Sequence, residues 1–283
     1  MSQSLRQIKN RIRSIENAKK VTSALEMISV SKLNRIDKLL IASRPYFTSM
    51  EFLVRSISAS SKFTSHPLAV KKNNKEICLC LITSDSGLCG MYNNSVIRAA
   101  RDFISKNSDK NIKLVVIGKR GFSFFKSHKL EMLNTYLGAN GNYSQGFSDE
   151  ISKYLMDNFL NNNFSEIFVA YTHFETALIQ RALVEKLLPV EQLVVNSVDY
   201  IFEPNVEGVL EKLMPEYVRM NLRKIILESF TSEHASRTLS MKAATDNAKE
   251  LLDGLVLLRN KVRQAGITQE MMEIISASEA LKG

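Results

Sequence analysis

The stretch "MKAATDNAKELLDGLVLLRNKVRQA", residues 241–265, decides the fold. Small and apolar residues recur in it at alternating steps of three and four, which is the heptad spacing of a coiled-coil seam. The predicted seam consists of Met241, Ala244, Ala248, Leu251, Leu255, Leu258, Val262 and Ala265. This spacing predicts a helix that packs along one partner helix. No proline follows Pro215, so a helix unbroken from there would be about 100 Å long.

The amino-terminal segment is the natural partner of that helix. Residues 4–60 contain no glycine and one proline, Pro45, which we expect to kink or interrupt the helix. Apolar residues recur mostly at helical steps, at Leu5, Ile8, Ile12, Ile15, Val21, Leu25, Ile28, Leu33, Ile36 and Leu40. Two helices from the two ends of one chain pair most simply in the antiparallel sense when the intervening domain lies at one end.

The middle of the chain has the texture of an α/β domain. The run "EICLCLITS" from Glu76 is nearly continuously apolar, which is typical of a strand buried on both faces. Further strands are expected at "IKLVVIG" and "EIFVAYTHF", and the β-rich stretch up to Phe202 is expected to form a hairpin. Helices are expected at "YNNSVIRAARDFISKN" and "GFSDEISKYLMDNFL", with Ser148 as the N-cap of the second helix. This alternation predicts a mainly parallel sheet with helices on its faces.

The fold class is therefore α/β, with a Rossmann-like domain inserted into a long antiparallel coiled coil. We expect an N-terminal coiled-coil helix over 1–60, a globular α/β domain over 76–204 and a C-terminal coiled-coil helix over 205–283. The Ser-, Lys- and Asn-rich residues between Ser56 and Lys75 read as a linker.

The charge distribution indicates an acidic partner. The 283-residue chain has a net charge of +9. Between Arg6 and Arg55 the sequence contains eleven Lys or Arg residues but only four Asp or Glu residues. Nucleic acid is one such partner, although no aromatic residues are interleaved with these charges. No apolar run reaches the ~18 residues of a membrane span. Three cysteines favour a reducing compartment over a disulfide framework.

The stretch "ITSDSGLCGMYNNS", residues 82–95, is the main candidate for chemistry. Cys89 is a candidate nucleophile, but the stretch lacks the G-x-S-x-G spacing of a nucleophile elbow, and no His is near in sequence. Neither glycine-rich phosphate-binding motif occurs, and "GKRGFSFF" from Gly118 reads as an ordinary turn between strand and helix. Cys78 and Cys80 share one strand face and read as core residues. We therefore expect no metal and no cofactor.

Three blocks of sequence carry a family resemblance. They are "IKNRIRSIENAKKVTSALEMISVSKLNR" (8–35), "ITSDSGLCGMYN" (82–93), and "SEHASRTLSMKAATDNAKELLDGL" (232–255) with "NKVRQAGITQEMMEIISASEAL" (260–281). Together they make the chain resemble the γ subunit of rotary (F-type) ATP synthases, essentially from end to end.

This resemblance implies a rotor shaft that is not itself an enzyme. The coupled reactions would be proton-driven rotation of the membrane ring and ATP synthesis or hydrolysis on the β subunits. The implied partners are three α and three β subunits, a small ε-type subunit and the proteolipid ring, and no nucleic acid. The implied location is peripheral, on the cytoplasmic face of a bacterial inner membrane, or alternatively on the matrix face of the mitochondrial inner membrane.

The resemblance also implies particular contact residues. The positions that match contacts to the β subunit are Arg263, Gln264, Thr268, Glu273, Leu25 and Met27. The positions that match contacts to the proteolipid ring are Tyr200, Phe202 and Glu203. This sequence departs from the usual family pattern at Leu25, Ser86, Met91, Phe202, Arg259 and Val262.

Overall fold

The computed structural model describes residues 5–58, 60–128, 130–192, 203 and 205–280. Contacts group the chain into two compact units. Residues 1–28 and 238–283 form the first, which we call the coil unit, and residues 29–237 form the second, the sheet unit. Because the coil unit combines two segments that are far apart in the sequence, the units do not correspond to the three predicted segments. The three-segment division stays a prediction.

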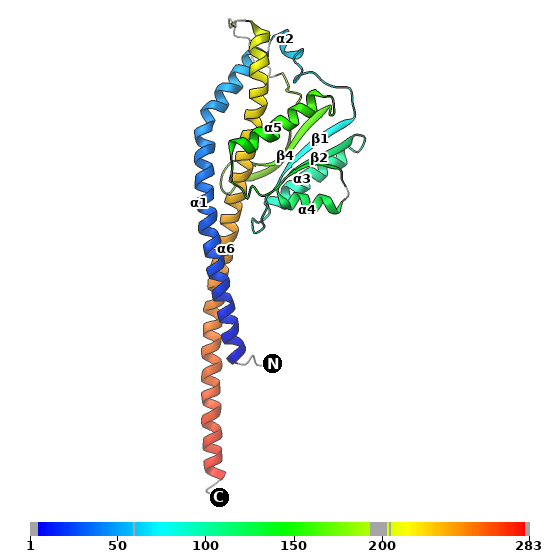
Figure 1. Cartoon of the computed structure of the whole chain (residues 1–283). Helices are drawn as coiled ribbons and strands as arrows, with labels where there is room; N and C mark the ends of the chain where they lie inside the picture. The colour runs from blue at the N-terminus through cyan, green and yellow to red at the C-terminus, as the bar shows by residue number, and fades with distance from the viewer. Residues whose placement is uncertain (1–4, 59, 129, 193–202, 204, 281–283) are drawn as a thin grey trace. The chain divides into compact units, whose positions relative to one another are not determined.

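Two long helices contribute to both units. Helix α1 runs from Leu5 to Ser58, and α6 runs from Val206 to Ala280 (Figure 1). Pro45 lies inside α1 and does not interrupt it. The residues on either side of it, Leu40 and Phe47, are buried, so packing offsets the roughly 3 kcal/mol that an internal proline costs a helix.

The sheet unit contains a five-stranded sheet in the order β3-β2-β1-β4-β5. The first four are parallel to their neighbours, and β5 pairs antiparallel with β4 in the predicted hairpin. The strands are β1 (Glu76–Ile82), β2 (Asn111–Ile117), β3 (Met132–Tyr136), β4 (Glu166–Phe174) and β5 (Gln180–Leu188). The helices between them are α2 (Ser61–Thr64), α3 (Tyr92–Lys106), α4 (Lys119–Ser127) and α5 (Gln145–Leu160).

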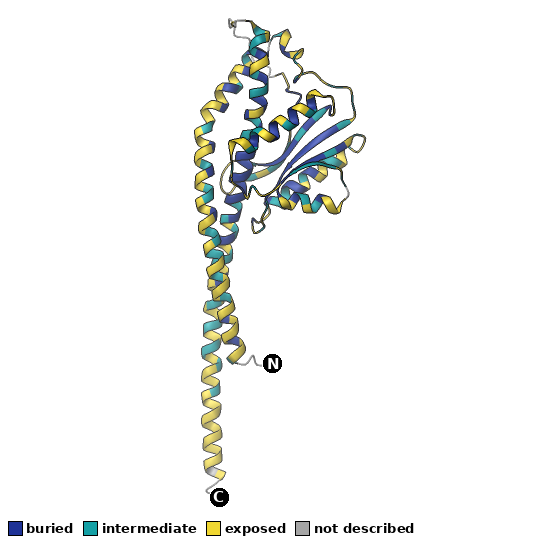
Figure 2. Ribbon diagram, in the orientation of Figure 1, coloured by how far each residue is buried: buried dark blue, intermediate teal, exposed yellow. Residues whose placement is uncertain are grey.

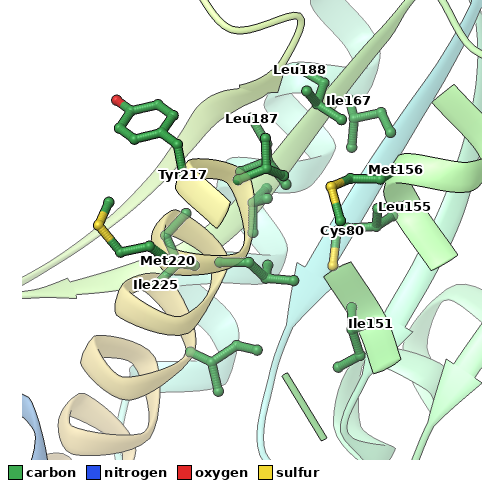
Figure 3. Close-up of a cluster of buried hydrophobic side chains, with 14 of the residues drawn as sticks. Cys80, Ile151, Leu155, Met156, Ile167, Leu187, Leu188, Tyr217, Met220 and Ile225 are labelled. Atoms are coloured by element: carbon green, nitrogen blue, oxygen red, sulfur yellow. The ribbon is translucent and has the colours of Figure 1, made fainter. Parts of the chain in front are cut away.

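The central strand β1 divides the core into two layers. Ile77, Leu79 and Leu81 pack with residues of α3 and α4 on one face of the sheet. Cys78, Cys80 and Ile82 pack with residues of α5 and α6 on the other face. Figure 3 shows part of this second layer, where Cys80 lies beside Met156 of α5. The prediction that the two cysteines share a strand face in the core is confirmed.

Two predictions about local structure are corrected by the fold. Helix α5 begins earlier than expected, because Ser144 rather than Ser148 accepts the capping hydrogen bond from the backbone N–H of Phe147. Ser148 is instead buried within the helix, where its hydroxyl donates to the carbonyl of Gln145. Residues 119–125, which were read as part of a turn between strand and helix, belong to helix α4 itself. Strand β3 was not predicted. Strand β3 is a half-buried edge strand without a long apolar run, so its sequence signal is weak.

Candidate partner-contact surface

The register of the coil unit follows from one hydrogen bond. Thr22 of α1 and Thr245 of α6 are joined through their hydroxyl oxygens, 2.8 Å apart. The two helices run antiparallel, so residues that face each other have numbers that add to about 267. Leu5 then lies opposite Val262, and Ile15 lies opposite Leu252.

The burial pattern agrees with that register. On α1 the less exposed positions repeat at steps of three and four along the whole coil unit. They are Leu5, Ile8, Ile12, Ile15, Lys19, Thr22 and Glu26, and beside them Ser23 and Leu25 are also half-buried. The opposing positions on α6 are also the less exposed ones. They are Val262, Arg259, Leu255, Leu252, Ala248, Thr245 and Met241.

The seam predicted from the sequence is therefore only partly right. Met241, Ala248, Leu255 and Val262 lie in it and Ala244 is half-buried beside Thr245, but Leu251 is 58 % exposed, and Leu258 and Ala265 are exposed as well. Leu252 takes the place of Leu251. The sequence offers leucine at both positions, and contact with α1 selects between them.

The predicted stripe on α1 fails in its middle part. Val21 and Ile28 were expected to face the partner helix but are more than half exposed. Lys19, Thr22 and Glu26 occupy the inner positions instead. Apolar residues here point outward because the heptad register set by Ile8 and Ile12, both buried, continues without a break.

The residues matched to β-subunit contacts lie in two separate groups on the coil unit. Met27 is 71 % exposed, and Leu25 is half-buried. Arg263, Gln264, Thr268 and Glu273 are all exposed. Leu25 lies opposite residue 242, which precedes Arg263 by 21 positions, or about 30 Å of helix. The structure therefore does not bring these groups together.

Local hydrogen bonds order the second group. The Thr268 hydroxyl donates to the carbonyl of Gln264 at 3.0 Å, and the Gln269 amide donates to the Glu273 carboxylate at 3.0 Å. Because Leu5 faces Val262, this group lies beyond the first described residue of α1. No described residue of α1 lies opposite this group.

The same part of α6 exposes apolar residues that the sequence reasoning missed. Figure 2 shows these last turns almost entirely in the colour of exposed residues. The large apolar side chains there are Ile267, Met271, Met272, Ile274 and Ile275, each at least half exposed. The apolar residues of the block 260–281 carried this signal in the sequence, because they continue past the last position of the predicted seam. Exposed apolar residues gathered in this way are typical of a protein–protein contact.

The residues matched to the proteolipid ring are only partly described. Glu203 is exposed, and Tyr200 and Phe202 lie outside the described residues.

The crevice where doubly wound sheets hold ligands is filled in this chain. Strand order reverses beside β1, and the carboxyl ends of β1 and β4 form the edge where such ligands bind. Helix α6 lies across that edge. Ser232 donates to the carbonyl of Thr172 at 3.3 Å, Ser236 donates to the carbonyl of Cys89 at 2.7 Å, and Ser229 is hydrogen-bonded to Tyr92 at 2.8 Å. The chain's own helix therefore occupies the position of a nucleotide.

The loop around Cys89 binds this helix rather than a substrate. Arg237 of α6 donates to the carbonyls of Gly87 and Ser86, both at 3.2 Å. Cys89 is 2 % exposed, and burial raises the pKa of its thiol, which is the opposite of what a nucleophile needs. Met91 has an ordinary backbone conformation with φ −85°. The interpretation of Cys89 as a small buried residue in a turn is confirmed.

Ionisable groups are buried where α6 meets this loop. The Glu233 carboxylate lies 2.8 Å from the Arg237 guanidinium, and burial raises the pKa of Glu233. His234 is neutral: burial lowers its pKa to about 4, and the positive charges of Arg237 and Lys32 act in the same direction. Its Nε2 donates to the carbonyl of Gly141, and its Nδ1 accepts from Arg237.

The described residues contain neither a metal-binding cluster nor a membrane-spanning helix. Among residues 5–280, apart from the undescribed gaps, no three His, Cys, Asp or Glu side chains form a group that could hold a metal ion. In the same part of the chain, every helix is too short or too polar to span a membrane.

Comparison with known proteins identifies the family. A family model described as ATP synthase matches residues 4–281. The ATP synthase gamma chains of Desulfitobacterium hafniense and Fusobacterium nucleatum are each 34 % identical to this chain over 280 residues, which cover 98–99 % of this chain and 99 % of each relative. A chain from the mitochondrial ATP synthase of Euglena gracilis has a similar fold, with a TM-score of 0.68 and 14 % identity over 98 % of this chain and 94 % of that one. The protein belongs to the ATP synthase gamma chain family.

Proposed function

We propose that this chain is the central rotor shaft of an F-type ATP synthase. It couples proton-driven rotation of a proteolipid ring to conformational changes of the catalytic β subunits, and it catalyses no reaction itself. Its partners are three α and three β subunits, an ε-type subunit and the ring. It is peripheral to the cytoplasmic face of a bacterial inner membrane, a choice supported by its bacterial relatives.

The observation that carries this proposal is the exposed end of α6, opposite which no described residue of α1 lies, in a chain of this family. The exposed apolar residues of its last turns suit a sleeve formed by other subunits. The polar group of Arg263, Gln264, Thr268 and Glu273 provides hydrogen-bonding side chains to the surrounding β subunits. Leu25 and Met27 form a second contact further along the shaft, and Tyr200, Phe202 and Glu203 contact the ring.

An asymmetric charge distribution supports rotation-dependent contacts. Residues 5–28 of α1 carry six Lys or Arg and two acids, a net charge of +4, whereas residues 238–280 of α6 carry five and six, a net charge of −1. One side of the coil unit is thus basic and the other is nearly neutral. A ligand shifts a conformational equilibrium only through different interactions with its states. A shaft with two unlike sides supplies that difference as it turns.

Rotation of the labelled chain tests the proposal directly. Surface-bound α3β3 complexes assembled with this chain should rotate a bead attached to it when ATP is added. Replacing Arg263 and Gln264 with alanine should slow rotation several-fold, whereas replacing exposed Leu178 of the sheet unit should not. A chain that purifies as a monomer and binds neither α nor β would contradict the proposal.

A further inference from the structure

One short loop of the sheet unit is bonded to both long helices. The loop, residues 137–141, is the first part of the connection from β3 to α5. The carbonyl of Asn140 accepts a hydrogen bond from the Lys32 ammonium of α1 at 2.9 Å. The carbonyl of Gly141 accepts one from His234 of α6 at 3.0 Å. The sheet is thereby tied to each helix at a defined atom.

Asp85 holds this loop in place. One carboxylate oxygen accepts from the backbone N–H groups of Gly138 at 3.1 Å and Lys119 at 3.0 Å, and the other accepts from that of Asn140 at 2.7 Å. Hydrogen bonds to a charged acceptor are stronger than those between neutral groups. Asp85 comes three residues after β1, the central strand. The loop is therefore fixed to the middle of the sheet.

The backbone of the loop brings it unusually close to α6. Gly138 and Gly141 both have positive φ, +86° and +65°. A Cβ at Gly141 would lie 2.4 Å from His234 Nε2, whereas a Cβ at Gly138 would meet nothing within 4 Å. Only glycine at 141 allows both the backbone conformation and the bond to His234.

We infer that Asp85 is a positioning residue for torque transfer, acting through the 137–141 loop to fix α1 and α6 against the sheet. This inference rests on the proposed function, in which torque passes between the sheet unit and the helices. Apolar packing is largely non-directional, so it resists separation of the surfaces better than small rotations. Hydrogen bonds weaken steeply when they are misaligned, so those to Lys32 and His234 resist rotation.

The test measures coupling in the complete enzyme. ATP synthase carrying each variant is placed in proteoliposomes, and proton uptake per ATP hydrolysed is compared with that of the wild type. Asp85→Asn removes the charged acceptor, and Gly141→Ala inserts a methyl group against His234. Each should lower proton uptake per ATP at least twofold, with subunit content and ATP hydrolysis retained. If Asp85 served only to fold the chain, its substitution would lower assembly of the enzyme and leave the proton uptake per ATP unchanged.

Matched variants serve as controls. Gly146→Ala, outside the 137–141 loop, adds a methyl group that meets nothing within 4 Å, and Asp109→Asn removes an exposed charge elsewhere. Both should couple like the wild type. Lys32→Met should lower coupling and Lys32→Arg should preserve it, because arginine keeps a charged donor.

The outcomes separate this inference from the proposed function. Wild-type coupling in Asp85→Asn, Gly141→Ala and Lys32→Met together would overturn the inference and leave the shaft proposal standing. Equal proton uptake by a complex that lacks the chain would refute the shaft proposal itself. If Gly141→Ala fails to assemble, Asp85→Asn and Lys32→Met decide, because neither adds bulk at the contact with α6.

Discussion

At the scale of single residues, polar side chains of α6 show how the helix fills the crevice at the carboxyl ends of β1 and β4. Arg237 donates hydrogen bonds to two loop carbonyls, and His234 donates one to a third. Each of these groups is buried and has a partner within the chain. Their burial makes stability depend on pH, because a buried neutral His resists protonation.

We predict that acid destabilises the wild type through His234. The folded-state pKa of His234 is lowered from 6.5 to about 4, so its stabilising effect is full above pH 6.5 and is lost as the pH falls toward 4. The loss should approach about 3 kcal/mol. Urea denaturation between pH 4.5 and 7.5 should show a steeper decline for the wild type than for His234→Gln.

The neighbouring Glu233 acts with the opposite sign. Its raised folded-state pKa favours the protonated acid, so its contribution is lost as the pH rises. Because Glu233 is present in both proteins, comparing them isolates the effect of His234. Parallel pH profiles would show that His234 is not the titrating group.

At the scale of secondary-structure elements, the helix pair shows how a register is chosen. The heptad spacing of residues 241–265 is visible in the sequence, but two adjacent leucines fit it equally well. Antiparallel packing on α1 places Leu252 toward the partner and leaves Leu251 exposed. One residue changes the direction of a helical side chain by about 100°, so the two alternatives are well separated.

Cysteine cross-linking distinguishes the two registers. We predict that the pair Ile15→Cys with Leu252→Cys forms a disulfide on mild oxidation several times faster than Ile15→Cys with Leu251→Cys. The native cysteines are buried and should stay reduced, which Ile15→Cys alone would verify. Faster oxidation of the pair that includes residue 251 would favour the seam expected from the sequence. Non-reducing electrophoresis provides the measurement.

At the scale of the whole molecule, the two units have unlike cores. The sheet unit buries two apolar layers around β1. The coil unit has a narrow seam whose middle consists of Lys19, Thr22 and Glu26. Because burial of apolar area is the main source of stability, the coil unit has less to hold it folded in the isolated chain.

We predict that hydrogen exchange divides α6 into two parts. In the isolated chain, amides of residues 238–280 should exchange at least tenfold faster than those of residues 210–230, although both belong to one continuous helix. Exchange followed by mass spectrometry of peptides would locate the change. Uniform protection along α6 would show that the coil unit is as stable as the sheet unit.

Local patterns in the sequence were enough to predict the long terminal helices, the buried strands and the absence of a phosphate-binding motif. Heptad spacing and continuous apolar runs reflect contacts that repeat along an element, so they can be read without knowing the partner. The candidate contact residues did not come from such patterns: they were implied by the blocks that resemble the γ subunit, and they stay a prediction.

Only the tertiary structure decided which side chains face inward in the coil and what fills the crevice of the sheet. The choice of Leu252 over Leu251 depends on a helix more than 200 residues away in the chain. The bonds from Arg237 and His234 join α6 to loops that precede it by about 90 to 150 residues. A buried polar group is hydrogen-bonded to whichever partner the fold places beside it, and a local sequence pattern does not predict such a pairing between distant segments.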